Sequence, residues 1–573
     1  MIRRRFLYNA ADIVNDCLTV VALEDGLTAK LSVNACEYCV DGNGNWKSLP
    51  ADTETQTINT GQTLSFRAKL IPIEEYGIGT FTVNKQFNLK GNCMSLLFGD
   101  DTKDCFSLAG KDNAFYRLFR QNTTLIDASE LILPATTLAD YCYASFFAGC
   151  TSLLFAPILP ATTSANYCYQ YMFSGCTSLT TAPELPATAL GASCYQYMFS
   201  GCTKLASAPS VLPATTLTSV PYCYYYMFNG CTSLTTPPLL PATALGSGCY
   251  QCMFQACTSL TTPPVLPATA LGSGCYQNMF NGCTKLASAP ELPATTLADS
   301  CYNSMFLGCK ALKSAPKLPA EKTTSNCYRG MFANCTSLTE APALPATNAA
   351  YYCYNSMFQG CTSLTTAPAL PATKLADYCY AIMFYGCTKL TTPPALPATT
   401  LANYCYQQMF TNCVFTTPPA LPATTLASNC YNNMFNSCKK MTVAPTLPAT
   451  ELANSCYNGM FRYCELLTEA PALPATTLKP ACYNDMFYWC TSLTSAPLLP
   501  ATTLVNNCYA TMFARCININ YIKALFTTTP GSDCTKDWLA YVASEGTFVK
   551  NKDATWDVVG ASGVPSGWSV ITE

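Results

Sequence analysis

Apolar side chains recur along most of this chain with a period of 26 residues. The clearest marker is Leu-Pro-Ala, which begins at fifteen positions between Leu133 and Leu499, and eleven of the fourteen intervals are 26 residues long. Repetition with such a period is the signature of a solenoid, whose units are too small to bury their own apolar faces and therefore pack on their neighbours. We expect stacked coils rather than a series of globular domains.

The spacing of apolar positions inside one unit predicts a helix. When Cys168, the first cysteine of one unit, is taken as position i, the residues that stay nearly constant from unit to unit are Cys, Tyr, Met, Phe and Cys at i, i+1, i+4, i+5 and i+8. This spacing forms a helical stripe. We predict a helix or 3-10 turn of about two turns that ends at i+7, where eight of fifteen units have glycine. The varying positions i+2, i+3 and i+6, Asn355 among them, are expected to be exposed.

A β-branched segment follows the second cysteine of each unit. In the repeat of Cys168 it is residues 177–181, Thr-Ser-Leu-Thr-Thr, and Pro183 comes soon after. Because proline cannot donate to a strand ladder, we predict a parallel strand of about three to five residues. The predicted fold class is a repeat solenoid of the α/β type, with one short parallel strand and one short helix or 3-10 turn per 26-residue coil, preceded by a small all-β domain.

The start of the chain lies outside the repeat. In residues 1–108, runs at 18–23, 63–70 and 79–83 predict strands. Turn signals lie at residues 41–44 and 59–61. We therefore predict an N-terminal β domain that serves for attachment.

The remaining boundaries follow the decay of the repeat at its two ends. Residues 109–132 are expected to form a degenerate capping repeat, with Ala114 and Asn122 at the cysteine positions. Residues 133–516 form a solenoid of fifteen coils, and residues 517–573 form a C-terminal cap and tail. Strands are predicted at 521–526 and 546–549, and the residues around Gly563, Pro565 and Gly567 are expected to be loosely attached. Three tryptophans fall in the cap: Trp538, Trp556 and Trp568.

Thirty of the 37 cysteines lie in fifteen pairs with members eight positions apart. If the intervening segment is helical, eight residues span about 12 Å, whereas bridged Cα atoms lie at most about 7 Å apart. A disulfide within a unit is therefore excluded on this interpretation, while bridges between equivalent cysteines of adjacent coils remain geometrically open. We favour reduced, buried cysteines that act as small apolar residues.

Catalytic chemistry has little support in the sequence. Histidine is absent, which removes Ser-His and Cys-His nucleophile pairs and every histidine metal site. Glu184, Glu291, Glu340 and Glu469 lie in different repeats, and we interpret them as single solvated charges. We predict that the protein is not an enzyme, with no catalytic residue, no cofactor and no metal.

Two Cys-x-x-Cys pairs, Cys36/Cys39 and Cys249/Cys252, have the spacing of metal or redox sites. Zinc requires four ligands, and no second pair stands at a suitable distance in the sequence. We interpret both pairs as structural.

Charge and hydropathy restrict the partners. The net charge is −2 and only 11% of residues are charged, so nucleic acid is not expected as a partner. No apolar run approaches the roughly 18–20 residues of a transmembrane segment. Three arginines at positions 3–5 resemble the start of a signal peptide, but polar residues interrupt the segment after them, and we predict no secretory signal.

Large side chains replace the usual small residues at i+6 and i+7 near the C-terminal end of the array. Equivalent positions of adjacent coils stack, so they are expected to form one contiguous patch. Exposed Trp, Tyr and Arg dominate binding hot spots, and we predict a ligand-binding patch here; contact with the C-terminal cap is the alternative. Its members are Arg462, Tyr463, Tyr488, Trp489 and Arg515.

Units such as residues 168–188, Cys-Tyr-x-x-Met-Phe-x-Gly-Cys-Thr-Ser-Leu-Thr-Thr-Ala-Pro-x-Leu-Pro-Ala-Thr, resemble the BspA-type leucine-rich repeats. The correspondence runs through Met172, Phe173, Cys176 and Leu179 and covers about residues 110–520. The resemblance implies a right-handed, leucine-rich-repeat-like solenoid. It also implies a surface or secreted protein of gut and oral microbes used for adhesion and protein binding, or a related array from their bacteriophages.

These observations favour a non-enzymatic recognition or adhesion protein that presents a long repeat surface. We prefer a bacteriophage virion component, in the tail or a fibre, that contacts the host surface. The alternative is a secreted or cell-surface bacterial adhesin of the BspA-like type. The expected partners are a host or cell-surface protein or glycan and, through the N-terminal domain, a virion or surface assembly; a homo-oligomer is also compatible with the pattern.

Overall fold

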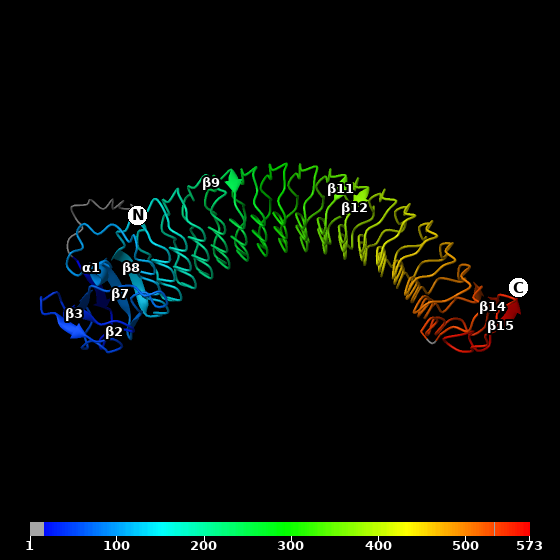
Figure 1. Cartoon of the computed structure of the whole chain (residues 1–573), viewed down its shortest axis with the longest axis horizontal. Coiled ribbons are helices and arrows are strands. Elements are labelled where there is room, and N and C mark those ends of the chain that lie inside the picture. The colour runs from blue at the N-terminus through cyan, green and yellow to red at the C-terminus, as the bar shows by residue number, and fades with distance from the viewer. Residues whose placement is uncertain (1–15, 532) are drawn as a thin grey trace. The chain divides into compact units, whose positions relative to one another are not determined.

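The structure, a computed structural model, describes residues 16–531 and 533–573 (Figure 1). Its contacts divide the chain into two units, one ending at Leu286 and one beginning at Ala287. The first unit contains the N-terminal sheet domain and the coils that follow it, and the second contains further coils and the C-terminal segment. The segment with three arginines at positions 3–5, for which no secretory signal is predicted, lies outside the described residues.

A small sheet domain opens the first unit, as predicted. Its six-stranded sheet has the order β4-β3-β5-β1-β7-β8, antiparallel throughout except for the parallel pair β7–β8. A second antiparallel pair, β2–β6, accompanies it, and the helix α1 follows β7. The strands predicted at 18–23, 63–70 and 79–83 are confirmed as β1, β5 and β6. The bounds are β1 Leu18–Ala22, β2 Ala29–Leu31, β3 Cys36–Val40, β4 Lys47–Leu49, β5 Thr63–Arg67, β6 Phe81–Val83, β7 Phe87–Asn92, α1 Ser95–Phe98 and β8 Leu125–Ile132.

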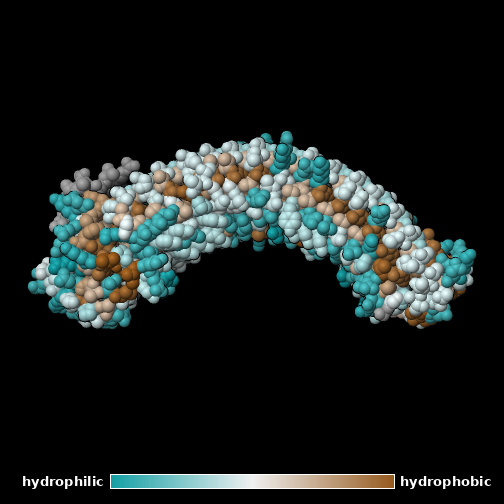
Figure 2. Space-filling model, in the orientation of Figure 1, coloured by the Kyte–Doolittle hydropathy of each residue, from teal (hydrophilic) through white to brown (hydrophobic). Residues whose placement is uncertain are grey.

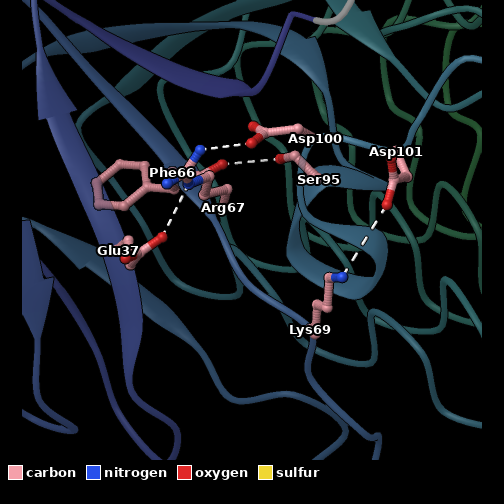
Figure 3. A network of polar contacts seen from close by, with 7 residues as sticks. All are labelled: Glu37, Phe66, Arg67, Lys69, Ser95, Asp100 and Asp101. Atoms are coloured by element: carbon pink, nitrogen blue, oxygen red, sulfur yellow. Dashed lines mark hydrogen bonds and ion pairs between the residues drawn. The ribbon is translucent and has the colours of Figure 1, made fainter. Parts of the chain in front are cut away.

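Alternation along β5 shows how this sheet is stabilised. Leu64 and Phe66 are fully buried, while Arg67 lies on the other face between the carboxylates of Glu37 and Asp100 (Figure 3). Inside the core, the Ser95 hydroxyl donates to the Phe66 carbonyl at 2.8 Å. One buried serine thus ties α1 to β5 and satisfies a main-chain acceptor that water cannot reach.

The sheet domain also covers the first coil of the array. Phe81 in β6 donates its backbone N–H to the carbonyl of Leu118 at 2.7 Å. The side chain of Asn122 accepts from the N–H of Val83 at 3.0 Å and donates to the carbonyl of Phe81 at 2.6 Å. The first coil therefore pairs with the domain through hydrogen bonds rather than ending in solvent.

The predicted solenoid of short coils is confirmed, and the helix or 3-10 turn predicted in each coil is a chain of turns. Among the described residues α1 is the only helix. Backbone N–H groups in this segment alternate between two acceptors. In the coil of Cys168, Tyr169 donates to the carbonyl of Cys194 in the next coil at 3.0 Å, whereas Met172 donates back to the carbonyl of Tyr169 at 3.1 Å. The alternation gives five hydrogen bonds between this coil and the next, from i−1, i+1, i+3, i+5 and i+7.

Left-handed residues are the physical reason for this difference. Positions i−1, i+3 and i+7 have φ of 55°, 56° and 74° at Tyr167, Tyr171 and Gly175, and the same positions are left-handed in the other coils. A residue with positive φ ends an α-helix, so a helix cannot pass through this segment. The backbone repeats every four residues, and constant positions at i, i+1, i+4, i+5 and i+8 fit that period as well as they fit 3.6.

The predicted strand ladder is also smaller than expected. Around residues 177–181 the coils pair only through isolated bridges such as Thr181↔Ser207. Strands of two residues occur instead after some Leu-Pro-Ala segments. A proline lies three residues before each of these strands and lacks the N–H that would extend the ladder in that direction. These short strands are β9 Thr216–Leu217, β10 Ala244–Leu245, β11 Asn348–Ala349 and β12 Lys374–Leu375.

The core of the β-solenoid contains the predicted constant residues. The Tyr, Met and Phe side chains at i+1, i+4 and i+5 are at most 2% exposed. Rings at equivalent positions stack almost in parallel: Tyr169 and Tyr195 have centroids 5.7 Å apart at 1°, and Phe173 and Phe199 have centroids 5.5 Å apart at 0°. Each coil therefore buries its apolar face against its neighbours, as a solenoid requires.

Every cysteine of the described residues is a free thiol, and the second cysteine of each coil has a specific partner. The thiol of Cys176 donates to the carbonyl of Phe147 in the preceding coil at 3.2 Å, and that of Cys361 donates to the carbonyl of Phe332 at 3.1 Å. A thiol is small and largely apolar but still has one weak donor. Cysteine therefore fits this buried position while supplying a hydrogen bond that alanine lacks.

The exposure predicted for the varying positions is only partly correct. Asn355 at i+2 is 5% exposed, and its amide oxygen accepts from the Ser356 hydroxyl at 3.1 Å. Most residues at i+2, i+3 and i+6 are half-buried. The reason is that equivalent side chains of adjacent coils cover one another, an effect that the pattern of a single repeat does not contain.

At the C-terminal end of the second unit, a parallel sheet of three strands follows the array, β13 Tyr521–Ala524, β14 Thr547–Lys550 and β15 Ser569–Thr572. The strands predicted at 521–526 and 546–549 are confirmed as β13 and β14. The predicted loose tail is wrong, because β15 pairs with β14 and the indole N–H of Trp568 donates to the Ala543 carbonyl at 2.7 Å.

The segment before β14 repeats the geometry of a coil. Tyr509 donates its backbone N–H to the carbonyl of Cys534 at 3.0 Å, and Phe513 donates to that of Trp538 at 2.9 Å. Trp538 is fully buried, and its indole donates to the Gly563 carbonyl at 3.0 Å. No helix in the described part of the chain has the length and hydropathy of a membrane-spanning segment.

We expect Phe332→Ala to lower the free energy of unfolding by about 3–5 kcal/mol, because it removes a buried ring and leaves a cavity. The Phe332 ring is fully buried and stacks on Phe306 at 5.6 Å and on Phe358 at 5.7 Å. Lys389 is exposed, and Lys389→Ala is expected to change stability by less than about 0.5 kcal/mol. Denaturant titration of the two variants measures the difference; equal losses would contradict the packing.

Alkaline pH should unfold the array. Burial raises the pKa of Cys387 and of Cys438 from 9.0 to about 12. An unfolded thiol ionises from about pH 9, but the native thiol stays neutral, so stability is retained below pH 9 and lost between pH 9 and 12. Near-UV circular dichroism in degassed buffer with reductant is expected to show cooperative loss of tertiary signal in this window. A native spectrum persisting at pH 12 would contradict the burial of the thiols.

Candidate functional site

All five side chains of the predicted patch lie close together in the second unit. They occupy i+6 and i+7 of three successive coils, those that begin at Cys456, Cys482 and Cys508. Each is half-buried. The patch thus presents part of each side chain to solvent while neighbouring coils support the rest.

The turn chain determines where these side chains lie. Tyr463, Trp489 and Arg515 at i+7 are left-handed, with φ of 59°, 63° and 66°. Tyr463 donates its backbone N–H to the carbonyl of Tyr488 at 2.8 Å, and Trp489 donates to that of Ala514 at 2.9 Å. Because these bonds link i+7 of one coil to i+6 of the next, they fix the two rows against each other.

The aromatic rings of the patch are not stacked in parallel. The rings of Tyr463 and Tyr488 meet edge to face, with centroids 5.5 Å apart at 83°. Tyr463 and Trp489 lie 6.0 Å apart at 45°. Tilted rings leave parts of their faces uncovered, and the two arginines occupy such faces.

Each arginine makes two cation–π contacts. The guanidinium carbon of Arg462 lies 5.1 Å from the ring centre of Tyr463 and 4.8 Å from that of Tyr488. The guanidinium carbon of Arg515 lies 4.7 Å from the ring centres of Trp489 and Tyr541. Charge and aromatic surface therefore alternate along the patch, which holds both arginines in defined places.

Sequence reasoning missed two members of this cluster. Tyr541 is 70% exposed and belongs to the segment that repeats the coil geometry. Taking Cys534 as position i of that segment places Tyr541 at i+7, so the signal was present in the sequence. Asp485 at i+3 has a carboxylate oxygen 3.8 Å from Arg462 and accepts a hydrogen bond from the Thr511 hydroxyl.

The C-terminal segment touches the patch but does not cover it. It contacts Arg515 through the ring of Tyr541, which is itself exposed, and through the Ala540 carbonyl, which accepts from the Arg515 backbone N–H at 2.7 Å. Packing against the cap, the alternative raised by the sequence, therefore accounts for one arginine only. Arg462, Tyr463 and Tyr488 have their ring contacts within the coils.

Other tyrosines form flat stacks that differ from the patch. Tyr171, Tyr197 and Tyr226 stack with centroids 4.7 Å apart at 6° and 4.9 Å apart at 15°. In the second unit, Tyr352 and Tyr378 stack 4.5 Å apart at 9°, and the Tyr378 ring stacks on Tyr404 at 4.4 Å. Since stacked rings cover each other's faces, these ladders offer ring edges rather than the tilted faces of the patch.

The hydropathy of the remaining visible surface is mostly intermediate. On the face shown in Figure 2, near-neutral and apolar residues cover much of the coils, and strongly hydrophilic residues stand in separate groups. This agrees with a chain in which only 11% of residues are charged. Against this background two arginines among three aromatic rings form a chemically distinct spot.

Cys36, Cys249 and Cys252 of the two Cys-x-x-Cys pairs differ in the pKa of their thiols. In the ranges that the structure describes, no group of three or more potential ligands is placed to hold a metal ion. Burial raises the pKa of Cys36 to about 12 and that of Cys252 to about 11, whereas a hydrogen bond with the Cys223 thiol lowers the pKa of Cys249. Neutral thiols are poor nucleophiles and poor metal ligands, so Cys36 and Cys252 are not reactive.

Two of the glutamates singled out in the sequence take part in contacts between neighbouring coils. In the first unit, Glu184 accepts from the Ser210 hydroxyl at 2.9 Å. In the second, Glu340 forms single bridges to Ser314 and Thr366 in the adjacent coils. Each of these two residues therefore serves the pairing of neighbouring coils.

Comparison with known proteins identifies the repeat. The family model of the BspA type leucine rich repeat region, in six copies, matches residues 127–261 and 254–391. Comparison with curated proteins and with solved structures gave no match. The matched residues include coils with the turn chain, the stacked rings and the thiol hydrogen bonds described above. Residues 127–391 are therefore a BspA-type leucine-rich repeat region.

Proposed function

We propose that this chain is a non-enzymatic recognition protein that binds a host-surface or cell-surface ligand through its repeat surface. BspA-type repeats suggest an adhesion or recognition protein at a surface or outside the cell. The observation that carries the proposal is the patch of Arg462, Tyr463, Tyr488, Trp489 and Arg515. It combines the three residue types that contribute most to binding energy at protein interfaces, and these residues are not needed to complete the core.

Within this class we favour a bacteriophage virion component, in the tail or a fibre. The support comes from the thiols. A chain with 37 cysteines, all free, is suited to folding in a reducing cytoplasm, where virion parts are assembled, because oxidising compartments favour disulfides. A bacterial adhesin that passes through an oxidising compartment would expose these thiols to pairing before the coils close over them.

The N-terminal domain is the proposed attachment point. Ile71 is 79% exposed, and Ile73 and Tyr76 are 43% and 47% exposed on the same loop. Ile71 also lines an open cavity of about 860 Å³ beside the first coil. Exposed apolar side chains gathered in this way are typical of a surface that another protein covers.

The second candidate is a secreted or cell-surface bacterial adhesin. The matched repeat family favours it directly, since the family suggests surface adhesion without a virion. Both candidates share the recognition role and differ in the structure that carries the chain.

Mass spectrometry separates the two locations. We expect peptides of this chain in virions purified by density gradient from lysates of the producing culture, in constant proportion to capsid protein. The surface and culture-medium fractions of uninfected cells are expected to contain none. The reverse distribution would reject the virion assignment and support the adhesin.

Adhesion depends on the patch if the proposal is correct. We expect Trp489→Asn in the labelled full-length chain to reduce binding to whole cells of the host bacterium by about tenfold. Asparagine tolerates the left-handed conformation and already occupies i+7 at Asn334 and Asn412, so the fold should persist. Lys389→Gln, on an exposed position of another coil, is the matched control. Equal adhesion by the two variants, measured by flow cytometry, would remove the patch from the binding surface.

A further inference from the structure

The two arginines of the patch retain unused hydrogen-bonding capacity. Arg515 lies between the rings of Trp489 and Tyr541, with its guanidinium carbon 4.7 Å from each ring centre. A cation–π contact engages the charge but leaves the N–H donors of the guanidinium free to bind oxygen acceptors. Among the described residues the Arg515 side chain has neither an ion pair nor a hydrogen bond. Its donors therefore remain available to a ligand.

The positive charge of Arg462 is only partly neutralised by a nearby carboxylate. Its nearest carboxylate, on Asp485, lies at 3.8 Å, which is longer than a hydrogen bond. That carboxylate also accepts a hydrogen bond from the Thr511 hydroxyl. The Nε atom of Arg462 is buried and has no acceptor. Arg462 thus has one carboxylate nearby that does not hydrogen-bond it, and among the described residues Arg515 has no ion-pair partner. The patch therefore has an excess of positive charge and of donors.

This excess is local rather than a property of the whole chain. The net charge is −2, so the protein as a whole does not attract polyanions. An anion that binds here must be held by the patch itself. Planar guanidinium groups match the geometry of oxyanions such as carboxylate and sulfate, to which they can donate two parallel hydrogen bonds.

The rings around the arginines indicate what carries the anion. Tyr541 is 70% exposed beside Arg515, and the rings of Tyr463, Tyr488 and Trp489 are tilted rather than stacked. Flat aromatic surface beside an oxyanion site suits a sugar ring that has an acidic substituent. A neutral sugar would leave the arginine donors unsatisfied, which lowers its affinity relative to an acidic one.

We propose that this patch recognises an acidic polysaccharide, with Arg462 and Arg515 binding its carboxylate or sulfate groups and the neighbouring rings contacting the sugar. The inference rests on the proposed recognition function and specifies the ligand class. Each arginine binds through charge-assisted hydrogen bonds, and the affinity therefore falls as salt screens the charges.

The test measures binding of the full-length chain to four immobilised polymers by surface plasmon resonance. Polygalacturonate supplies carboxylates, dextran sulfate supplies sulfates, dextran is the neutral glycan, and polyglutamate is an acidic peptide. We expect at least one acidic glycan to bind about tenfold or more tightly than both dextran and polyglutamate. Whichever of the first two binds more tightly identifies the acidic group.

The variants separate the patch from general electrostatics. The paired change Arg462→Gln with Arg515→Gln is expected to weaken binding to the preferred acidic glycan about tenfold or more. Glutamine already occupies these positions elsewhere, as Gln255 and Gln359 at i+6 and Gln121 at i+7, so the coil accommodates it. Lys374 and Lys389 are exposed on another part of the second unit, and the pair Lys374→Gln with Lys389→Gln removes the same charge and should leave binding unchanged.

The inference is overturned if dextran binds as tightly as the acidic glycans, if the glutamine pair binds as tightly as the parent chain, or if polyglutamate binds best, which would assign the patch to an acidic protein. If no acidic glycan binds while the chain still adheres to whole cells, the ligand class is wrong and the recognition function stands. Loss of both would reject the recognition function as well.

Discussion

Hydrogen bonding between the backbones of neighbouring coils is the constraint on which the rest of this structure depends. In the segment between the two cysteines, every second N–H donates to the next coil and the remaining ones close turns within their own coil. Such a backbone requires a left-handed residue at every fourth position. The arrangement holds equivalent residues of adjacent coils at a fixed short distance, and the stacked tyrosines and phenylalanines follow from it.

The sequence contains enough information for the solenoid, for the buried identities at i, i+1, i+4, i+5 and i+8, and for the strands β1, β5, β6, β13 and β14. It does not distinguish a helix from the turn chain, because the constant positions fit a period of four as well as one of 3.6. The decisive feature is the left-handed backbone, and residues such as Tyr167 and Tyr171 seldom adopt it when neighbours do not enforce it. Asn355 illustrates the same limit, since its burial comes from adjacent coils rather than from its own repeat.

The candidate site follows the same logic. Stacking of equivalent positions was sufficient to expect that Arg462, Tyr463, Tyr488, Trp489 and Arg515 lie together, and the structure places them within ring-contact distances. The sequence-based prediction did not include Tyr541, because the coil to which this residue belongs lacks the Tyr, Met and Phe that mark the other coils. It did not include Asp485 either, because a single carboxylate at i+3 has no evident role until its distance from Arg462 is known. Patterns within the repeat are thus readable from the sequence, whereas departures from it need coordinates.

Between the two cysteines of a coil, the backbone hydrogen bonds to neighbouring coils all run in the same direction along the chain, which allows such chains to change length by whole coils. A coil offers carbonyl acceptors to the coil before it and N–H donors to the coil after it, so any two interior coils match each other. The unequal spacings of 25, 27 and 28 residues fall outside the segment between the cysteines, which always spans eight positions. Recombination between two copies within the gene would therefore delete or duplicate whole coils and still leave the new neighbours correctly paired. Arrays of this kind can become longer or shorter, and can change which coils carry binding side chains such as Trp489, while the fold stays the same.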